Sequence, residues 1–142
     1  MHTVELSYTV EPSAEELLAS LSPTAIVEYA DIFAIESHET VGETDRMTVS
    51  FDENTMVLEF VELSDGYEYT MVDGSGLFAT RQSTIRVKDE SETEVTATME
   101  YTLDSRLAFV LNYLAAKTVR RELELTVENL VAQTMDAEPT LE

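Results

Sequence analysis

The chain has 142 residues, of which 44% are hydrophobic, enough to build the core of one domain of ordinary size. It contains no cysteine, which excludes disulfide bonds, thiol catalysis, iron–sulfur clusters and thiolate zinc sites. Eight lysine and arginine residues against 29 aspartate and glutamate residues give a net charge of −21, which opposes binding to nucleic acid and to anionic membranes.

The first elements can be read from alternation and capping signals. Apolar and polar side chains alternate over residues 4–10, which predicts a strand with one solvent-exposed face. Ser13 with Glu16 three residues later forms a capping-box pattern, which predicts the start of a short helix. Ser22-Pro23 supplies an N-cap and a proline at the first helical position, so a second short helix follows.

The middle of the chain predicts a meander of strands, and its end predicts one helix. Alternation returns at Ile32, and turn signals divide the segment into six antiparallel strands. From Asp104 to Met135 there is no glycine or proline, and apolar residues recur at helical spacing, which predicts one long helix. The strands are placed near 32–41, 45–52, 55–64, 67–72, 78–88 and 94–103.

The order strand, two short helices, six antiparallel strands and long helix resembles the helix-grip fold of the SRPBCC superfamily. That superfamily includes START lipid-transfer domains, the major birch pollen allergen group and polyketide aromatase/cyclases. The resemblance covers nearly the whole chain and rests on element order, element lengths and the Ser22-Pro23 break. It implies an α+β fold in which a curved, seven-stranded antiparallel sheet wraps around the C-terminal helix and leaves an internal cavity. We predict a single domain over residues 1–142, with a disordered tail from about residue 136.

Turn positions predict how neighbouring strands pair. A two-residue turn at Glu53-Asn54 places Phe51 opposite Met56, and a pairing of Val87 with Val95 sets the last hairpin. A two-residue turn at Asp65-Gly66 continues the ladder. These pairings bring one polar cross-strand row onto the inner face of the sheet: Glu62, Tyr69, Arg81 and Tyr101.

The polar row has two interpretations. In the first, it forms the polar end of the cavity, where Arg81 binds a carboxylate or carbonyl of a ligand and Ser83 adds a hydrogen bond. In the second, Glu62 and Arg81 form an ion pair that satisfies itself, or the row lies in water at the open end of the sheet.

The resemblance implies that the protein binds or transports a hydrophobic small molecule or lipid in this cavity. The alternative is a polyketide cyclase/dehydratase-like enzyme that uses the Tyr/Arg row, and an interaction module is a third possibility that no residue specifically supports. No catalytic residue is assigned. The candidate cavity residues are Glu62, Tyr69, Arg81, Ser83, Tyr101, Phe51, Leu58, Phe60, Met71, Met99, Leu107, Leu111 and Leu114.

We predict no intrinsic metal and no cofactor, because the chain carries no histidine-based metal motif and no calcium-loop pattern. There are two histidines. The alternation places His38 with Glu36 on the face opposite Ile35 and therefore in solvent.

Two features of the long helix concern partners. Lys117, Arg120 and Arg121 are expected to pair with Glu122 and Glu124 at helical spacing, with a ligand phosphate as the alternative. The helix is apolar on both sides, so either the short helices or a second subunit covers the side away from the sheet. The protein is therefore expected to be a monomer or a homodimer.

The acidic residues are spread along the chain instead of forming a tail. Their repulsion is largely screened at 1 M salt, where the Debye length is about 3 Å. We interpret the chain as a halophilic, cytoplasmic protein of a salt-accumulating cell, the alternative being an ordinary acidic protein. The sequence shows no signal-peptide pattern and no apolar run long enough for stable membrane insertion.

Overall fold

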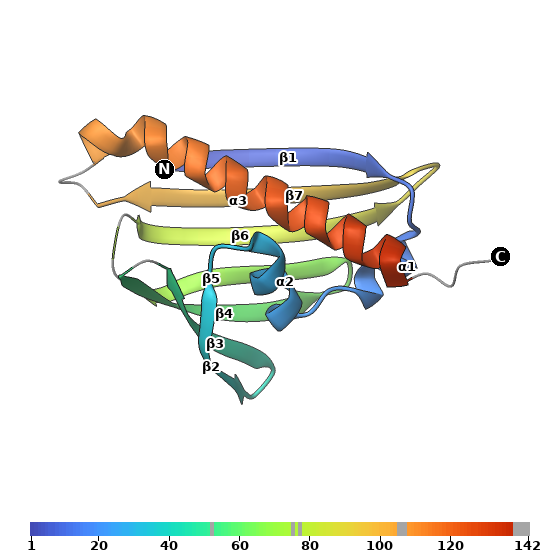
Figure 1. The fold of residues 1–142 in the computed structure, drawn as a ribbon, viewed down its shortest axis with the longest axis horizontal. Coiled ribbons are helices and arrows are strands. Elements are labelled where there is room, and N and C mark those ends of the chain that lie inside the picture. Colours follow the sequence, from blue (N-terminus) through green and yellow to red (C-terminus); the bar gives the residue numbers. More distant parts are fainter. Residues whose placement is uncertain (52, 75, 77, 105–107, 138–142) are drawn as a thin grey trace.

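A seven-stranded antiparallel sheet curves around one long helix in the computed structural model (Figure 1). The structure describes residues 1–51, 53–74, 76, 78–104 and 108–137, without the side chains of residues 108–112 and 137. No helix in these ranges is long and apolar enough to cross a membrane.

The elements follow the predicted order. Along the sheet the strands run β1-β7-β6-β5-β4-β3-β2, so β1 and β2 form the two edges and the sheet stays open. This arrangement confirms the predicted α+β helix-grip architecture. The bounds are β1 (His2–Val10), α1 (Ala14–Ala19), α2 (Pro23–Ala30), β2 (Ala34–Val41), β3 (Thr44–Phe51), β4 (Asn54–Leu63), β5 (Gly66–Gly74), β6 (Phe78–Asp89), β7 (Thr93–Leu103) and α3 (Ala108–Ala137).

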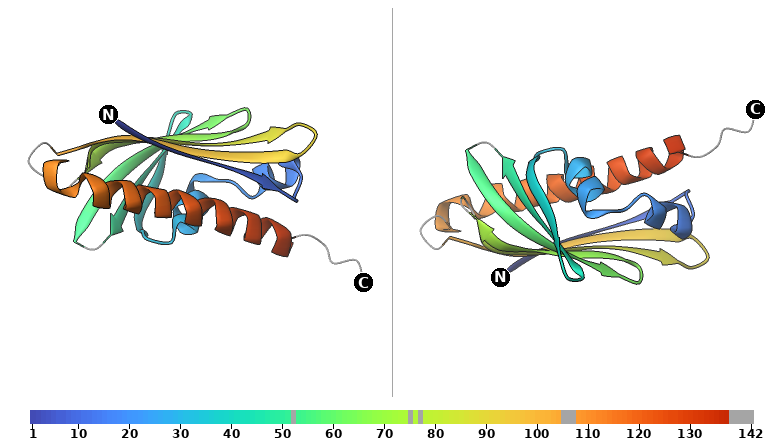
Figure 2. Two further views of the ribbon diagram at one scale, coloured as in Figure 1. Left: turned by 90° about the horizontal axis from the view of Figure 1, so that it is seen from above. Right: turned by 90° about the horizontal axis from the view of Figure 1, so that it is seen from below.

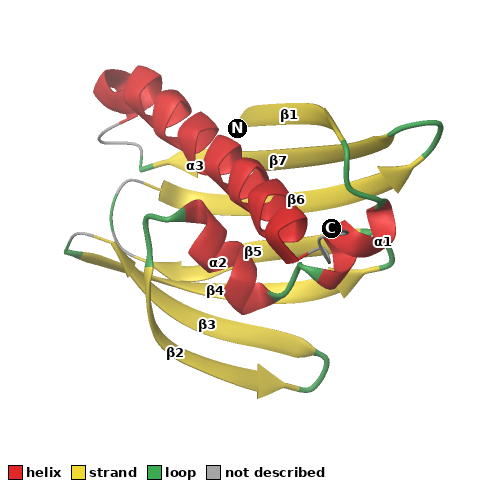
Figure 3. Ribbon diagram, turned by 45° about the vertical axis from the view of Figure 1, so that its right-hand side comes forward, coloured by secondary structure: helices red, strands yellow, loops and turns green. Residues whose placement is uncertain are grey.

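The helices cover the concave face of the sheet. The helix α3 lies across this face and passes close to β1 and β7 (Figure 2). The helix α2 packs beside α3, over the middle of the sheet (Figure 3). The side-chain amide of Asn129 in α3 donates a hydrogen bond of 2.7 Å to the Tyr29 carbonyl in α2. The two helices are therefore held together by a polar contact as well as by packing.

Local sequence starts both short helices as predicted. The Ser13 hydroxyl accepts a hydrogen bond from the Glu16 N–H, and the Glu16 carboxylate accepts one from the Ser13 N–H, both at 3.1 Å. The Ser22 hydroxyl caps α2 by accepting a hydrogen bond from the Ala25 N–H at 3.1 Å, and Pro23 is the first residue of the helix. The helix α2 ends at Asp31, whose φ of 57° is the left-handed conformation that aspartate tolerates better than most residues.

Strand pairing agrees with the prediction in the last hairpin, where Val87 lies opposite Val95 and Arg81 opposite Tyr101. The hairpin formed by β3 and β4 pairs differently from the prediction, because Phe51 lies opposite Asn54 instead of Met56.

The predicted turn at Asp65-Gly66 is also wrong, because Leu63 pairs with Gly66 and the turn lies one residue earlier. Glu62 therefore lies opposite Tyr67. In both hairpins the observed partner lies two positions away from the predicted one. A shift by two residues does not change which face a side chain is on, so the inner face keeps the predicted side chains.

The edge strand β2 contains a bulge that the alternation did not predict. Ile35 pairs with Val49 but Ser37 pairs with Thr48, so one extra residue lies in β2. The bulge turns His38 onto the inner face, opposite Met47, where the sequence had placed it on the outer face.

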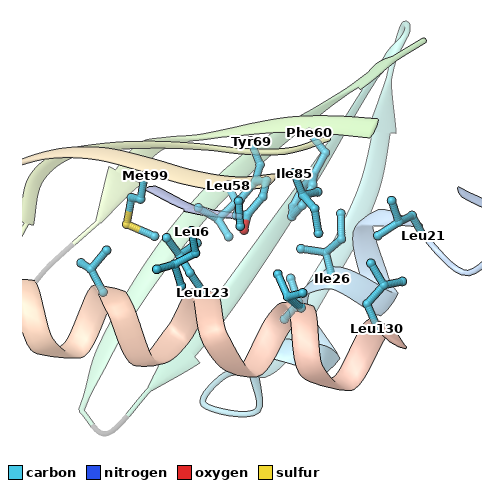
Figure 4. Close-up of a cluster of buried hydrophobic side chains, with 14 of the residues drawn as sticks. Leu6, Leu21, Ile26, Leu58, Phe60, Tyr69, Ile85, Met99, Leu123 and Leu130 are labelled. Atoms are coloured by element: carbon cyan, nitrogen blue, oxygen red, sulfur yellow. The ribbon is translucent and has the colours of Figure 1, made fainter. Parts of the chain in front are cut away.

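The core lies between the sheet and α3 (Figure 4). The inner-face methionines Met47, Met56 and Met99 are at most 1% exposed and fill space under the sheet. Leu114 of α3, which the prediction placed in the cavity, is 55% exposed, while the adjacent Ala115 is buried. The other buried residues among the described part of α3 are Val119, Glu122, Leu123, Thr126, Val127, Leu130 and Thr134.

Candidate ligand-binding site

The predicted polar row forms only in part: Arg81 lies opposite Tyr101 as predicted, but Tyr69 lies opposite Ser83 and Glu62 opposite Tyr67. Glu62 points to the inner side but is exposed at the end of β4, two residues before the turn. Arg81 is buried in β6, as predicted for an inward-facing residue. The predicted Glu62–Arg81 ion pair is therefore wrong.

Arg81 instead pairs with Glu122 of α3. A terminal guanidinium nitrogen donates to the Glu122 carboxylate at 2.5 Å, and both side chains are only 3% exposed. The rings of Phe33 and Phe78 lie 5.8 Å and 5.2 Å from the guanidinium carbon. The cation is thus held by one carboxylate and two aromatic rings, away from water.

Two hydroxyl groups lie beside this pair. Tyr69 is opposite Ser83 and stacks on Phe60 with a centroid distance of 4.9 Å. Burial raises the pKa of Tyr69 far above its usual range, and the nearby Glu122 carboxylate raises it further. Tyr69 therefore stays protonated, while the Ser83 hydroxyl is buried without a hydrogen bond of good geometry.

Tyr101, the last member of the predicted row, is part of an aromatic cluster. Its ring stacks on His2 at 5.3 Å and meets Phe78 edge-on at 5.6 Å. Burial raises the pKa of its hydroxyl. Tyr101 therefore contributes packing at this end of the sheet.

A pocket of about 480 Å³ opens on one side of α3, where Ile32 from the α2–β2 connection faces the helix. Ile32 is 42% exposed and, with Leu114, provides its apolar side. We call this pocket the Ile32 groove. Its lining on α3 comprises Leu114, Lys117, Thr118, Arg120, Arg121, Glu122 and Glu124.

One of the predicted cavity residues, Leu114, lines the groove, and the other predicted cavity residues that the structure describes do not line it. Leu58, Phe60 and Met99 are at most 1% exposed in the core, and Phe51 and Met71 are partly buried against it. Leu107 and the side chain of Leu111 lie outside the described residues.

Sequence reasoning missed Ile32 and Glu122. Glu122 had a readable signal, because it lies three and seven residues after the buried Val119 and Ala115 on the apolar stripe of α3. Ile32 had none, since its role depends on where the α2–β2 connection runs.

The three basic residues of α3 do not pair as predicted. Glu122 is bonded to Arg81, and among the described residues Lys117, Arg120 and Arg121 form no ion pair. The predicted helical pairing with Glu122 is wrong because that carboxylate points into the core. Three exposed cations therefore remain along the helix.

The bulge in β2 creates a second polar cluster. The His38 imidazole nitrogen Nε2 lies 3.1 Å from the Asp45 carboxylate, and the Thr40 hydroxyl donates to the same oxygen at 3.1 Å. Within the described ranges no group of three or more histidine, aspartate or glutamate side chains could hold a metal ion.

Comparison with known proteins gives matches at the level of structure. No family model and no curated protein matches the sequence. TTHA0849 from Thermus thermophilus superposes with a TM-score of 0.78 at 16% identity, covering 97% of this chain and 100% of that one. A START superfamily protein from Mycobacterium smegmatis gives 0.73 at 13%, with coverages of 97% and 100%. The Zhui aromatase/cyclase from Streptomyces sp. R1128 gives 0.73 at 16%, with 94% and 93%. The chain therefore has the same helix-grip fold as these three proteins.

Proposed function

We propose that the protein binds a hydrophobic small molecule or a lipid in the Ile32 groove. The observation that carries this proposal is the pocket of about 480 Å³ with two large, exposed apolar side chains, Ile32 and Leu114, on its wall. Small-molecule sites are concave, mostly apolar and about 300–1,000 Å³ in volume. Exposed apolar surface gathered at such a pocket is a sign of an occupant.

The structural relatives support a binding role in general terms, since one is a START superfamily protein and another an aromatase/cyclase. In this chain the space between the sheet and the middle of α3 is filled by core side chains such as Met99 and Leu123. The site that we propose therefore lies toward the N-terminal half of α3, beside the core.

The alternative function, a cyclase- or dehydratase-like enzyme, has less support from the geometry. It relies on Arg81 as a group that contacts the substrate. The Arg81 guanidinium is bonded to Glu122 and enclosed by two rings, so a substrate would have to displace a buried carboxylate.

A charge placed in the apolar wall tests the binding proposal. We expect Ile32→Glu to weaken binding of 1-dodecanol, an uncharged ligand, by about tenfold or more, because the carboxylate is desolvated by the alkyl chain. Binding is measured by competition with an uncharged fluorescent dye, N-phenyl-1-naphthylamine. The matched control is Val61→Glu on β4, where the replaced side chain is 43% exposed against 42% for Ile32. Circular dichroism checks that both variants are folded.

Equal loss of binding in the two variants, or no dodecanol binding by the unchanged protein, would contradict the proposal. A second copy of the chain could occupy the groove instead of a small molecule, and light scattering tests this by measuring whether the protein is a dimer. A dimer that Ile32→Glu converts to monomers, with no dodecanol bound, would also overturn it.

A further inference from the structure

Positive charge is concentrated along the Ile32 groove. Lys117, Arg120 and Arg121 line it, and they are three of only eight basic residues in a chain of net charge −21. All three are exposed. Such a local reversal of sign beside an apolar wall focuses an attractive potential for anions.

The cations are not neutralised by their neighbours. Among the described residues none of the three has a carboxylate within ion-pair distance. Two carboxylates line the groove, but Glu122 is already bonded to Arg81. Among the described residues that line the groove, only the Glu124 carboxylate is left to oppose the three cations.

The helix orders apolar and cationic groups along one face. Leu114, Lys117, Thr118 and Arg121 follow each other at spacings that keep them on one side of α3, since residues three and four apart are neighbours on a helix surface. Leu114 provides an apolar start, and Arg121 lies about two turns further on. A second pocket of about 310 Å³ on the β1 side of α3 also includes Lys117 and Arg120, whereas Arg121 lines only the Ile32 groove of these two.

We infer that the ligand of the Ile32 groove is an anionic amphiphile, with its alkyl chain against Ile32 and Leu114 and its carboxylate or phosphate on Lys117 and Arg121. This inference rests on the proposed function and adds the chemical class of the ligand. Arginine and lysine bind both head groups through charge-assisted hydrogen bonds.

Four ligands with the same alkyl chain test the inference: dodecanoate, dodecyl phosphate, 1-dodecanol and dodecyltrimethylammonium. We expect the unchanged protein to bind at least one of the two anions more tightly than the alcohol, and the alcohol more tightly than the cation. The anion that binds more tightly identifies the head group as carboxylate or phosphate.

The double variant Lys117→Gln/Arg121→Gln should bind the anions roughly five- to tenfold more weakly, as expected for two partly exposed charges, and should bind dodecanol unchanged. The matched control is Arg86→Gln/Lys88→Gln, which removes the same charge from the outer face of β6. The control should leave anion affinity unchanged.

Two results would overturn the inference while leaving the proposed function standing. One is equal affinity of the unchanged protein for dodecanol and both anions. The other is an equal loss of anion affinity in the two double variants, which would be an effect of total charge. Failure of dodecanol and both anions to bind would overturn the proposed function and the inference together.

Discussion

The buried ion pair between Arg81 and Glu122 connects two elements that are far apart in the sequence. It joins the middle of the sheet to α3 at 2.5 Å, with both side chains 3% exposed. An ion pair in such a place adds little net stability compared with apolar residues, yet removal of one partner leaves an uncompensated buried charge.

The two residues should therefore show strong coupling. Either Arg81→Met or Glu122→Leu alone is expected to lower the free energy of unfolding by about 3–5 kcal/mol, while the double variant regains most of this loss. Urea unfolding at one fixed salt concentration measures all four proteins. The partly exposed pair Arg46–Glu59, also at 2.5 Å, is the control, and its loss should cost less than about 1 kcal/mol.

Additive effects of the two single substitutions would contradict a coupled pair.

The sequence predicted that Arg81 faces inward but assigned it the wrong partner. Strand alternation identifies neighbours only within the sheet, whereas Glu122 belongs to a helix whose rotation about its axis is set by packing. A carboxylate on the apolar stripe of that helix was the one available signal.

At the scale of elements, the strands and helices were predictable and their pairing was less so. Period-2 alternation located every strand, and capping patterns located α1 and α2. The register of β4 and β5 was wrong because Asp65-Gly66 was taken for the turn. Gly66 is the first residue of β5, and glycine is needed there because a Cβ would lie 1.8 Å from the Ile85 carbonyl oxygen.

This close approach makes Gly66 sensitive to substitution. Gly66→Ala should lower the free energy of unfolding by about 3 kcal/mol or more, because the backbone of β6 must move. Gly42→Ala is the control: its φ of +63° is strained for alanine, but no atom lies within 4 Å of the new Cβ, so about 1 kcal/mol is expected. Equal losses in thermal or urea unfolding would show that contact with Ile85 is unimportant.

For the whole molecule, the order of elements was enough to identify the fold, but the candidate site was not predictable from it. The resemblance led us to expect a cavity lined by inner-face residues such as Phe60 and Met99, which the structure places in the packed core. The Ile32 groove arises because Leu114 rotates outward and the α2–β2 connection approaches it. Both are consequences of tertiary packing.

Net charge is also a property of the whole molecule, and it predicts a dependence on salt. Repulsion among 29 acidic residues should weaken the folded state in dilute buffer, so the urea midpoint should rise as KCl increases from roughly 0.1 M to 1 M, where screening shortens the Debye length from about 10 Å to about 3 Å. A variant with three exposed acids neutralised, Glu11→Gln/Glu43→Gln/Glu90→Gln, should depend less on salt. A midpoint independent of KCl would contradict the halophilic interpretation.

The bulge in β2 affects how molecules behave toward one another when salt is high. As an edge strand, β2 presents backbone groups that another chain could pair with, and carboxylates such as Glu36 and Glu39 discourage this by repulsion. In molar salt that repulsion acts only at very short range. The extra residue between Ile35 and Ser37 interrupts the regular row of backbone donors and acceptors at any salt concentration. The irregular backbone of this edge therefore hinders strand-to-strand aggregation even at salt concentrations that screen the repulsion between its charges.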